Sequence, residues 1–208
     1  MRPMTAKWLQ IVLVGGAATL LAAWIAVAAT SAAVPAPEAL WKSIKTLKQQ
    51  HAIMPGSRPF QAGSRVADVY TVDLSNGPAS RIIGPKGKIT SVTRYPAGSL
   101  LVKENYDRAR KLTSVAAMLK IDGYDRDDRN WLMASYSPAG KVLSYGKVST
   151  CIACHRMVSK ADFVFAPPPL QMLPVSVWKA FFPTQAISPT YRKLLASHPE
   201  AVIGGARP

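Results

Sequence analysis

Two cysteines and a histidine stand close together near residue 150 of this 208-residue chain, in the segment Cys151-Ile-Ala-Cys154-His155. At this spacing two thiols can reach the two vinyl groups on one edge of a porphyrin, and the histidine after the second thiol can bind the iron. The segment therefore predicts one covalently attached haem c, with Cys151 and Cys154 as its anchors and His155 as the proximal iron ligand.

Other uses of a cysteine pair fit this sequence less well. A redox-active dithiol favours a thioredoxin-like βαβ setting, and none surrounds the segment. A structural zinc site needs further cysteine or histidine ligands, but the remaining histidines, His51 and His198, show no suggestive spacing. With no cysteine beyond this pair, the chain has no disulfide framework.

The sixth coordination position of the iron is not assigned by the sequence. Candidate ligands are His51, His198, Met118 and Met133. None lies in a context typical of an axial ligand, and methionine at such positions is usually a core residue. We therefore expect a five-coordinate iron that a small nitrogen or oxygen species can reach.

The charge of the chain bears on its partners. The formal net charge is +15 and the isoelectric point is about 10.1. A surface of this charge attracts anionic lipid headgroups, an acidic redox partner or an anionic small molecule. No nucleic-acid-binding motif accompanies the charge, so we expect no nucleic acid partner.

The N-terminal segment is apolar and uncharged from Trp8 to Pro37, and Arg2 and Lys7 precede it. It is long enough to cross a bilayer, with the basic residues held in the cytoplasm. We expect residues 1–34 to be a signal anchor in the inner membrane, with the rest of the chain in the periplasm. The alternative is a signal peptide cleaved near Ser31-Ala-Ala33, which would release the protein.

The remainder predicts an α+β fold, an antiparallel β-sheet with flanking helices and a haem helix near the C-terminus. Residues 35–53 would be a linker and an amphipathic helix, 54–166 the cytochrome domain, and 167–208 a proline-rich tail. Residues 75–88 carry several Gly and Pro and are expected to be a long connection. The predicted helix is Glu38–Gln50, and the predicted strands are Val66–Leu74, Ser99–Val102, Leu112–Lys120, Trp131–Tyr136 and Val142–Tyr145.

The tail is too apolar for a free linker, since it contains Leu170, Trp178, Phe181 and Phe182. Ser188-Pro189 predicts the start of a short helix that runs through Leu195. We expect the tail to wrap the domain or to dock on a partner, and partial disorder is the alternative.

Several segments together resemble the cytochrome P-460 family. They are Tyr95–Glu104 (YPAGSLLVKE), Met118-Leu-Lys120, Trp131, the haem motif, and Ala161–Phe165 (ADFVF). The resemblance covers about residues 54–166. It implies an exported, often dimeric protein built on an antiparallel sheet and related to the β type of cytochrome c′. The best-known members oxidise hydroxylamine, and nitric oxide binding also occurs.

The resemblance assigns roles to particular positions. Lys103 matches the lysine that is bonded to a haem meso carbon in those members, so it is the candidate cross-link. Ala116 stands where hydroxylamine-oxidising members have a distal glutamate, and alanine cannot accept a proton. Glu104, Asp107 or Asp122 could substitute. Asp162 matches an acid of the family pattern, and we expect it to be structural, capping the next segment.

We therefore expect a mono-haem cytochrome that binds or redox-processes hydroxylamine or nitric oxide, with electrons passed to another carrier. Whether it is an enzyme is left open. The alternative is a membrane-tethered electron-transfer subunit beside a larger redox complex, which a six-coordinate iron would favour. A gas-binding protein without turnover is the third hypothesis, and Ala116 makes it more plausible.

Overall fold

The computed structural model describes residues 33–49, 70–86, 89–107, 109–166 and 168–204, which belong to one compact unit spanning residues 31–208. The predicted anchor or signal segment, residues 1–34, lies outside the described residues except for its last two. No helix in the described part of the chain is long and apolar enough to cross a membrane.

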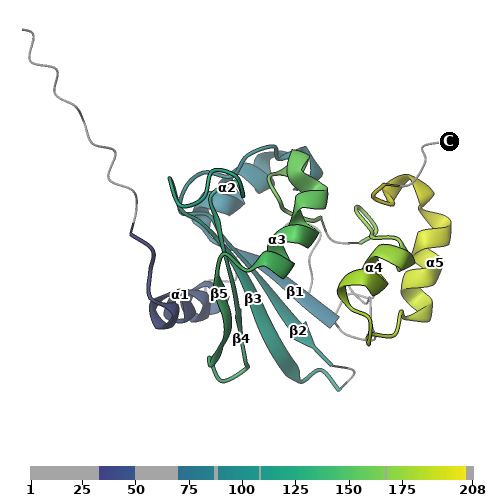
Figure 1. The fold of residues 1–208 in the computed structure, drawn as a ribbon, viewed down its shortest axis with the longest axis horizontal. Coiled ribbons are helices and arrows are strands. Elements are labelled where there is room, and N and C mark those ends of the chain that lie inside the picture. Colours follow the sequence, from purple (N-terminus) through teal and green to yellow (C-terminus); the bar gives the residue numbers. More distant parts are fainter. Residues whose placement is uncertain (1–32, 50–69, 87–88, 108, 167, 205–208) are drawn as a thin grey trace, which may run out of the picture. The chain divides into compact units, whose positions relative to one another are not determined.

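An antiparallel sheet forms the centre of the fold (Figure 1). In the described part of the chain it has five strands that pair in sequence order. They are β1 (Tyr70–Ser75), β2 (Leu100–Tyr106), β3 (Leu112–Lys120), β4 (Trp131–Tyr136) and β5 (Val142–Gly146). The predicted α+β class and antiparallel sheet are confirmed. Of the strand predicted over residues 66–74, residues 66–69 lie outside the described residues.

One prediction for this region is wrong. Residues 77–86, expected to be part of a long connection, form helix α2 (Gly77–Lys86), and the 3₁₀ helix η2 (Ile89–Ser91) follows. The side chain of Asn76 accepts a hydrogen bond from the Ala79 amide (3.2 Å), and Pro78 occupies the first turn, where it needs no amide partner. Ala79 and Ile83 are fully buried. Burial of this face outweighs the weak helix propensity of Gly and Pro.

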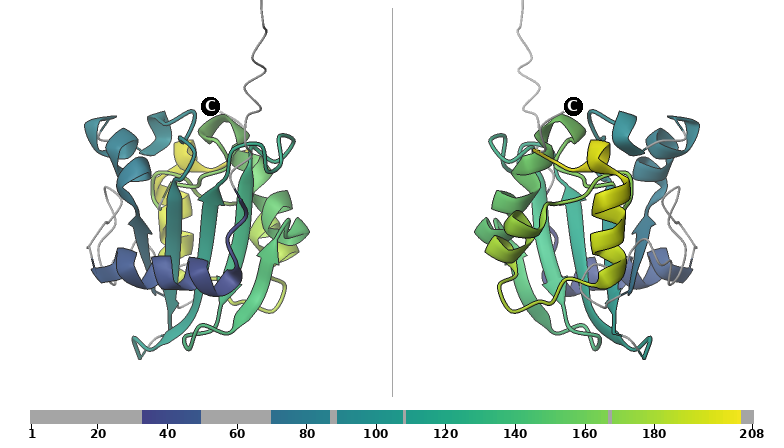
Figure 2. Two further views of the ribbon diagram at one scale, coloured as in Figure 1. Left: turned by 90° about the vertical axis from the view of Figure 1, so that its left-hand side faces the viewer. Right: turned by 90° about the vertical axis from the view of Figure 1, so that its right-hand side faces the viewer.

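Helix α1 (Pro37–Gln49) covers one face of the sheet (Figure 2). Its buried side chains, spaced as one helical stripe, are Leu40, Ile44 and Leu47. They pack against inward-facing residues of the strands in one hydrophobic cluster. The Tyr136 hydroxyl donates a hydrogen bond to the Pro37 carbonyl (3.0 Å), which fixes the start of the helix. The predicted amphipathic helix is confirmed.

The opposite face of the sheet packs against α2, helix α3 (Ser149–His155) and the segment that follows the 3₁₀ helix η3 (Arg156–Ala161). Alternate residues of the strands, such as Leu101, Met118 and Met133, join Ile152 of α3 in a second hydrophobic cluster. We call this face of the sheet the α3 face.

The tail forms helices α4 (Val175–Phe181) and α5 (Pro189–Ser197) and the 3₁₀ helix η4 (Pro199–Ala201). These elements share a small core around Met172, Ile187 and Tyr191. Ser188 caps α5 by accepting a hydrogen bond from the Tyr191 amide (3.1 Å), so the helix predicted at Ser188-Pro189 is confirmed. Docking of the tail on a partner stays a prediction.

Candidate haem-binding site

The cysteines of the predicted haem motif lie on α3. Cys151 and Cys154 are three residues apart in the helix, so both thiols project from neighbouring positions on one side of it. Both are free and partly buried, and burial raises the pKa of each thiol. Ile152 between them is buried in the cluster on the α3 face and holds the helix against the sheet.

His155 is the last residue of α3, and its ring is fixed by a backbone group. Its Nδ1 lies 2.6 Å from the carbonyl oxygen of Phe163. A carbonyl can only accept, so Nδ1 carries the proton and Nε2 keeps its lone pair. Burial lowers the pKa of His155, the bond to Phe163 acts in the opposite direction, and the charge of Lys103 lowers it further. A neutral imidazole with a free Nε2 is the form that binds a metal.

Lys103 lies on the same side of the sheet as these residues. It is two positions from Leu101 in β2, so its side chain projects from the α3 face. Its charge opposes the rise that burial causes in the pKa of Cys154 and adds to the lowering of the pKa of His155, so Lys103 lies within electrostatic reach of the end of α3. The structure thus brings the four residues predicted for the site to one face.

The strand register identifies the neighbours of Lys103. It pairs with Ala116 of β3, which in turn pairs with Ser135 of β4. On its other side it pairs with Asp73 of β1, a position that the sequence reading did not single out. The alternation of side chains expected for the strand over residues 66–74 could have indicated the face on which Asp73 lies. The sequence could not show that Asp73 pairs with Lys103.

The acids that the sequence offered in place of the missing glutamate do not lie with Lys103. Glu104 is on the opposite face, buried, and accepts a hydrogen bond from the Tyr106 hydroxyl at 2.6 Å. Asp107 accepts a bond from the Lys111 amide (2.9 Å) in the β2–β3 loop. Asp122 is exposed beyond the end of β3.

The candidates for the sixth iron ligand are in different parts of the molecule. Met118 and Met133 pair with each other across β3 and β4 and are buried in the cluster on the α3 face. His198 lies in the tail, where its Nδ1 is 3.2 Å from a Glu200 oxygen. His51 lies outside the described residues.

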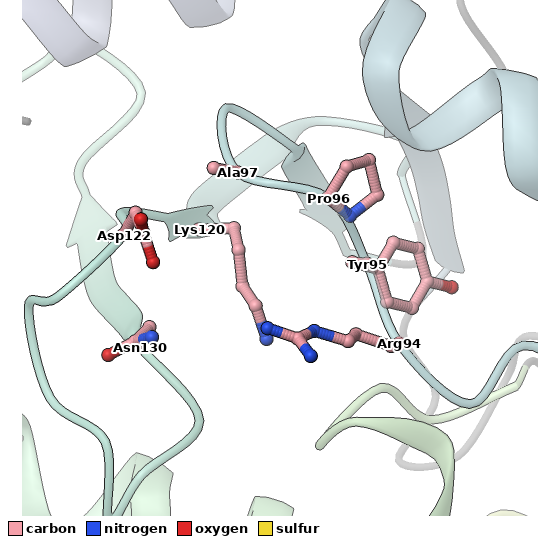
Figure 3. Close-up of a pocket in the computed structure, with 7 residues that line it drawn as sticks. All are labelled: Arg94, Tyr95, Pro96, Ala97, Lys120, Asp122 and Asn130. Atoms are coloured by element: carbon pink, nitrogen blue, oxygen red, sulfur yellow. The ribbon is translucent and has the colours of Figure 1, made fainter. Parts of the chain in front are cut away.

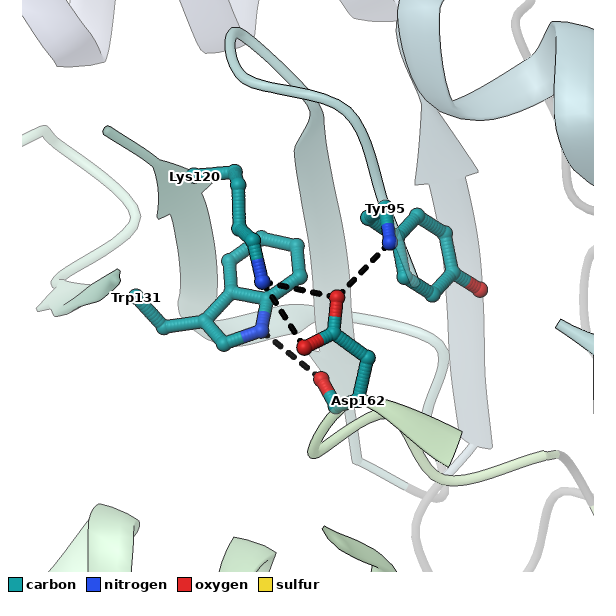
Figure 4. Close-up of polar contacts among 4 residues, drawn as sticks. All are labelled: Tyr95, Lys120, Trp131 and Asp162. Carbon is teal, nitrogen blue, oxygen red and sulfur yellow. Dashed lines mark hydrogen bonds and ion pairs between the residues drawn. The ribbon is translucent and has the colours of Figure 1, made fainter. Parts of the chain in front are cut away.

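Asp162 is buried at the end of η3 and accepts hydrogen bonds from three other segments (Figure 4). Its carboxylate binds the Lys120 ammonium at 2.7 and 2.8 Å and the Tyr95 amide at 2.7 Å. Its carbonyl accepts the Trp131 indole N–H at 2.7 Å. The structural role expected for Asp162 agrees with these contacts, but the expected cap of the next segment is wrong, because the carboxylate bonds to the sheet and to the loop before β2 instead.

A cavity of about 220 Å³ adjoins the Lys120 side of this ion pair (Figure 3). The Arg94 guanidinium points toward the Lys120 ammonium across it. Burial lowers the pKa of Lys120, Asp162 opposes this shift, and the charges of Arg94 and Arg129 add to it. The cavity is lined by Arg94, Tyr95, Pro96, Ala97, Lys120, Asp122 and Asn130.

Comparison with known proteins agrees with the resemblance read from the sequence. Residues 81–166 match the family model described as Cytochrome P460, whereas no curated protein matches the chain. The matched range contains Lys103 and the whole haem motif. The family implies haem c and iron, and its members are typically exported. The free thiols of α3 and the free Nε2 of His155 fit that cofactor. The match over residues 81–166 therefore supports assignment of this part of the chain to the cytochrome P460 family.

Proposed function

We propose that the chain is an exported mono-haem c-type cytochrome that binds or redox-processes hydroxylamine or nitric oxide at a five-coordinate iron. The hydrogen bond from His155 Nδ1 to the Phe163 carbonyl is the observation that carries the proposal. It leaves Nε2 for iron on the same helix as two free thiols. The family match supports the same cofactor.

Each residue of the site has a role in this proposal. Cys151 and Cys154 would hold the haem through thioether bonds, and His155 would bind its iron. When bound, the haem supplies an iron centre that can coordinate a small nitrogen species and exchange electrons. Lys103 is the candidate for a bond to the macrocycle, which is supported by its position on the α3 face and its electrostatic reach to Cys154.

The residues around Lys103 favour binding over fast turnover. Oxidation of hydroxylamine releases protons, which a positioned carboxylate ordinarily accepts. Ala116, next to Lys103 in the register, has no such group, and Glu104 projects from the other face. Because Ala116 lacks the carboxylate found there in hydroxylamine-oxidising members, the chain suits retention of a small nitrogen ligand, and Asp73, which pairs with Lys103 on its other side, is the remaining acid of this register.

The cellular setting is part of the proposal. Residues 1–34 would direct export and, if uncleaved, tether the domain to the inner membrane. The net charge of +15 suits an acidic redox partner that accepts the electrons. A homodimer is compatible with the family and stays a prediction.

The experiment is an absorption spectrum of the purified protein, made with an active haem-attachment system, in the ferric and reduced states. Lys103→Arg is the test variant and Cys151→Ala the control for attachment. We expect a broad, red-shifted reduced Soret band that sharpens to an ordinary c-type band in Lys103→Arg. Hydroxylamine and nitric oxide are then added to the wild-type protein, and spectral shifts report binding.

Other outcomes decide between the alternatives. Sharp low-spin bands in both proteins, unchanged by added ligands, would mean that the sixth position is filled and would favour the electron-transfer subunit. Identical high-spin spectra in both proteins would refute only the proposed cross-link to Lys103. Protein without covalent haem would refute the proposal as a whole.

A further inference from the structure

We infer that the buried Lys120–Asp162 ion pair positions the proximal histidine, by holding the turn whose Phe163 carbonyl accepts the His155 Nδ1–H. The inference rests on the proposed function, because it concerns His155 as an iron ligand. It assigns Asp162 and Lys120 as positioning residues that act on the iron through the histidine.

The turn after η3 has a backbone conformation that its residues do not favour. Asp162 has φ 53° and ψ 41°, and Phe163 has φ 68°. Both lie in the left-handed region, where a Cβ crowds the backbone and glycine is the usual occupant. Two such residues in succession persist only where their surroundings hold them.

Hydrogen bonds within the turn account for part of its stability. The Asp162 amide donates to Ser159 (3.1 Å), and the Phe163 amide donates to Val158 (3.2 Å). These bonds close the turn locally. They do not attach it to the sheet, so they do not determine where the Phe163 carbonyl lies.

Contacts through Asp162 attach the turn to the sheet (Figure 4). Lys120 at the end of β3 and Trp131 at the start of β4 pair with each other in the register, and both donate to Asp162. The Tyr95 amide donates to the same carboxylate. Asp162 is 1% exposed and Lys120 is 7% exposed, so water competes little for these bonds.

The position of the Phe163 carbonyl matters for the iron. A hydrogen bond from Nδ1 increases the electron donation of the imidazole through Nε2, which stabilises ferric over ferrous iron. If the turn relaxes, the 2.6 Å bond lengthens and the donation falls. The reduction potential then rises and the iron–histidine bond weakens.

The ion pair formed by Arg156, the residue after His155, supplies the control. Arg156 forms an ion pair with Asp128 (2.6 Å), and its side chain is 58% exposed. This pair lies next to the histidine in sequence but has no bond to Asp162 or Phe163 among the described contacts. Breaking it tests whether any nearby ion pair has the same effect.

The experiment uses the full-length, haem-loaded protein and two charge-neutral double variants. The test variant is Lys120→Met with Asp162→Asn, and the control is Arg156→Met with Asp128→Asn. Each removes one positive and one negative charge, so net charge does not shift the potential. The readouts are the reduction potential and the iron–histidine stretching frequency of the ferrous protein by resonance Raman.

We expect the test variant to show a higher potential and a lower stretching frequency, and the control to match the wild type. Wild-type values in the test variant, or equal shifts in both variants, would overturn the inference and leave the proposed function intact. A wild-type protein without haem would overturn both. If the test variant does not fold, Trp131→Phe takes its place, because it removes one hydrogen-bond donor to the turn and keeps an aromatic ring. The inference then requires smaller changes in the reduction potential and the stretching frequency, in the same directions.

Discussion

Gly140 and Gly98 offer a test of how α1 is seated on the sheet. Both have positive φ, 88° and 79° respectively. A Cβ at Gly140 would clash with Trp41 Nε1 and lie 2.6 Å from its Cε2, whereas nothing lies within 4 Å of a Cβ at Gly98. Trp41 in α1 packs against Tyr136 with 5.2 Å between ring centroids, so a shift of the indole away from residue 140 would disturb this ring contact.

The expected free energies of unfolding follow from these distances. An alanine in the left-handed region is destabilising by roughly 1–2 kcal/mol, and this applies to both Gly98→Ala and Gly140→Ala. Overpacking at a close contact adds about 1–3 kcal/mol at Gly140 alone. We therefore expect a total loss of roughly 2–5 kcal/mol for Gly140→Ala, and the smaller loss for Gly98→Ala.

Urea unfolding followed by circular dichroism measures both losses on the haem-loaded chain. A Trp41→Ala background supplies the control, because Gly140→Ala should lose its additional penalty there. Equal losses for the two glycine variants, or an undiminished penalty without Trp41, would refute the close contact between Gly140 and α1.

Three further predictions concern the site, the α2 cap and the pH dependence. Ala116→Glu should raise hydroxylamine turnover, by up to about 10²-fold if the carboxylate accepts protons, and Ala116→Gln should not. Asn76→Ala should destabilise the protein by about 2–3 kcal/mol in urea, since Asn76 accepts from Ala79 and Leu100 and donates to Gly98. The Lys147 ammonium lowers the pKa of Asp125, so its stabilisation is present above about pH 4 and is lost as pH falls further. In thermal melts at a series of pH values between about 5 and 2, the melting temperature of Asp125→Asn should fall less with decreasing pH than that of the wild type.

The sheet could be predicted from the sequence where strands alternate between two faces. Leu112–Lys120 and Trp131–Tyr136 were placed to the residue, because each has β-branched or aromatic residues bounded by turn residues. Helix α2 was missed, because its stability depends on a cap and a buried face. Asn76 binds Leu100 and Gly98, which are 24 and 22 residues away, and local sequence does not reveal such partners.

The candidate site also combines residues that local sequence reveals with contacts that it does not reveal. The haem motif is local, so its residues could be predicted from spacing alone. The ion pair joins Lys120 to Asp162, 42 residues later, and the turn it holds contains no glycine to signal a positive φ. Sequence reasoning recognised Asp162 as structural but could not predict its partners.

The alternation of side chains along β2 limits where a proton acceptor for the site can lie. Lys103 and Glu104 are adjacent in β2, so their side chains project from opposite faces, and a one-residue slip of register would exchange them. The irregularity between β2 and β3 falls at Asn105 and Tyr106, beyond Lys103, and leaves the pairing of Lys103 with Ala116 intact. Glu104 is also held on the far face by Tyr106. An acceptor within the sheet must therefore come from the row that contains Lys103, in which Asp73 pairs with Lys103 on one side and Ala116 on the other. Ala116→Glu tests a carboxylate at the position where hydroxylamine-oxidising members have one, and Asp73→Asn tests the acid that this row already contains.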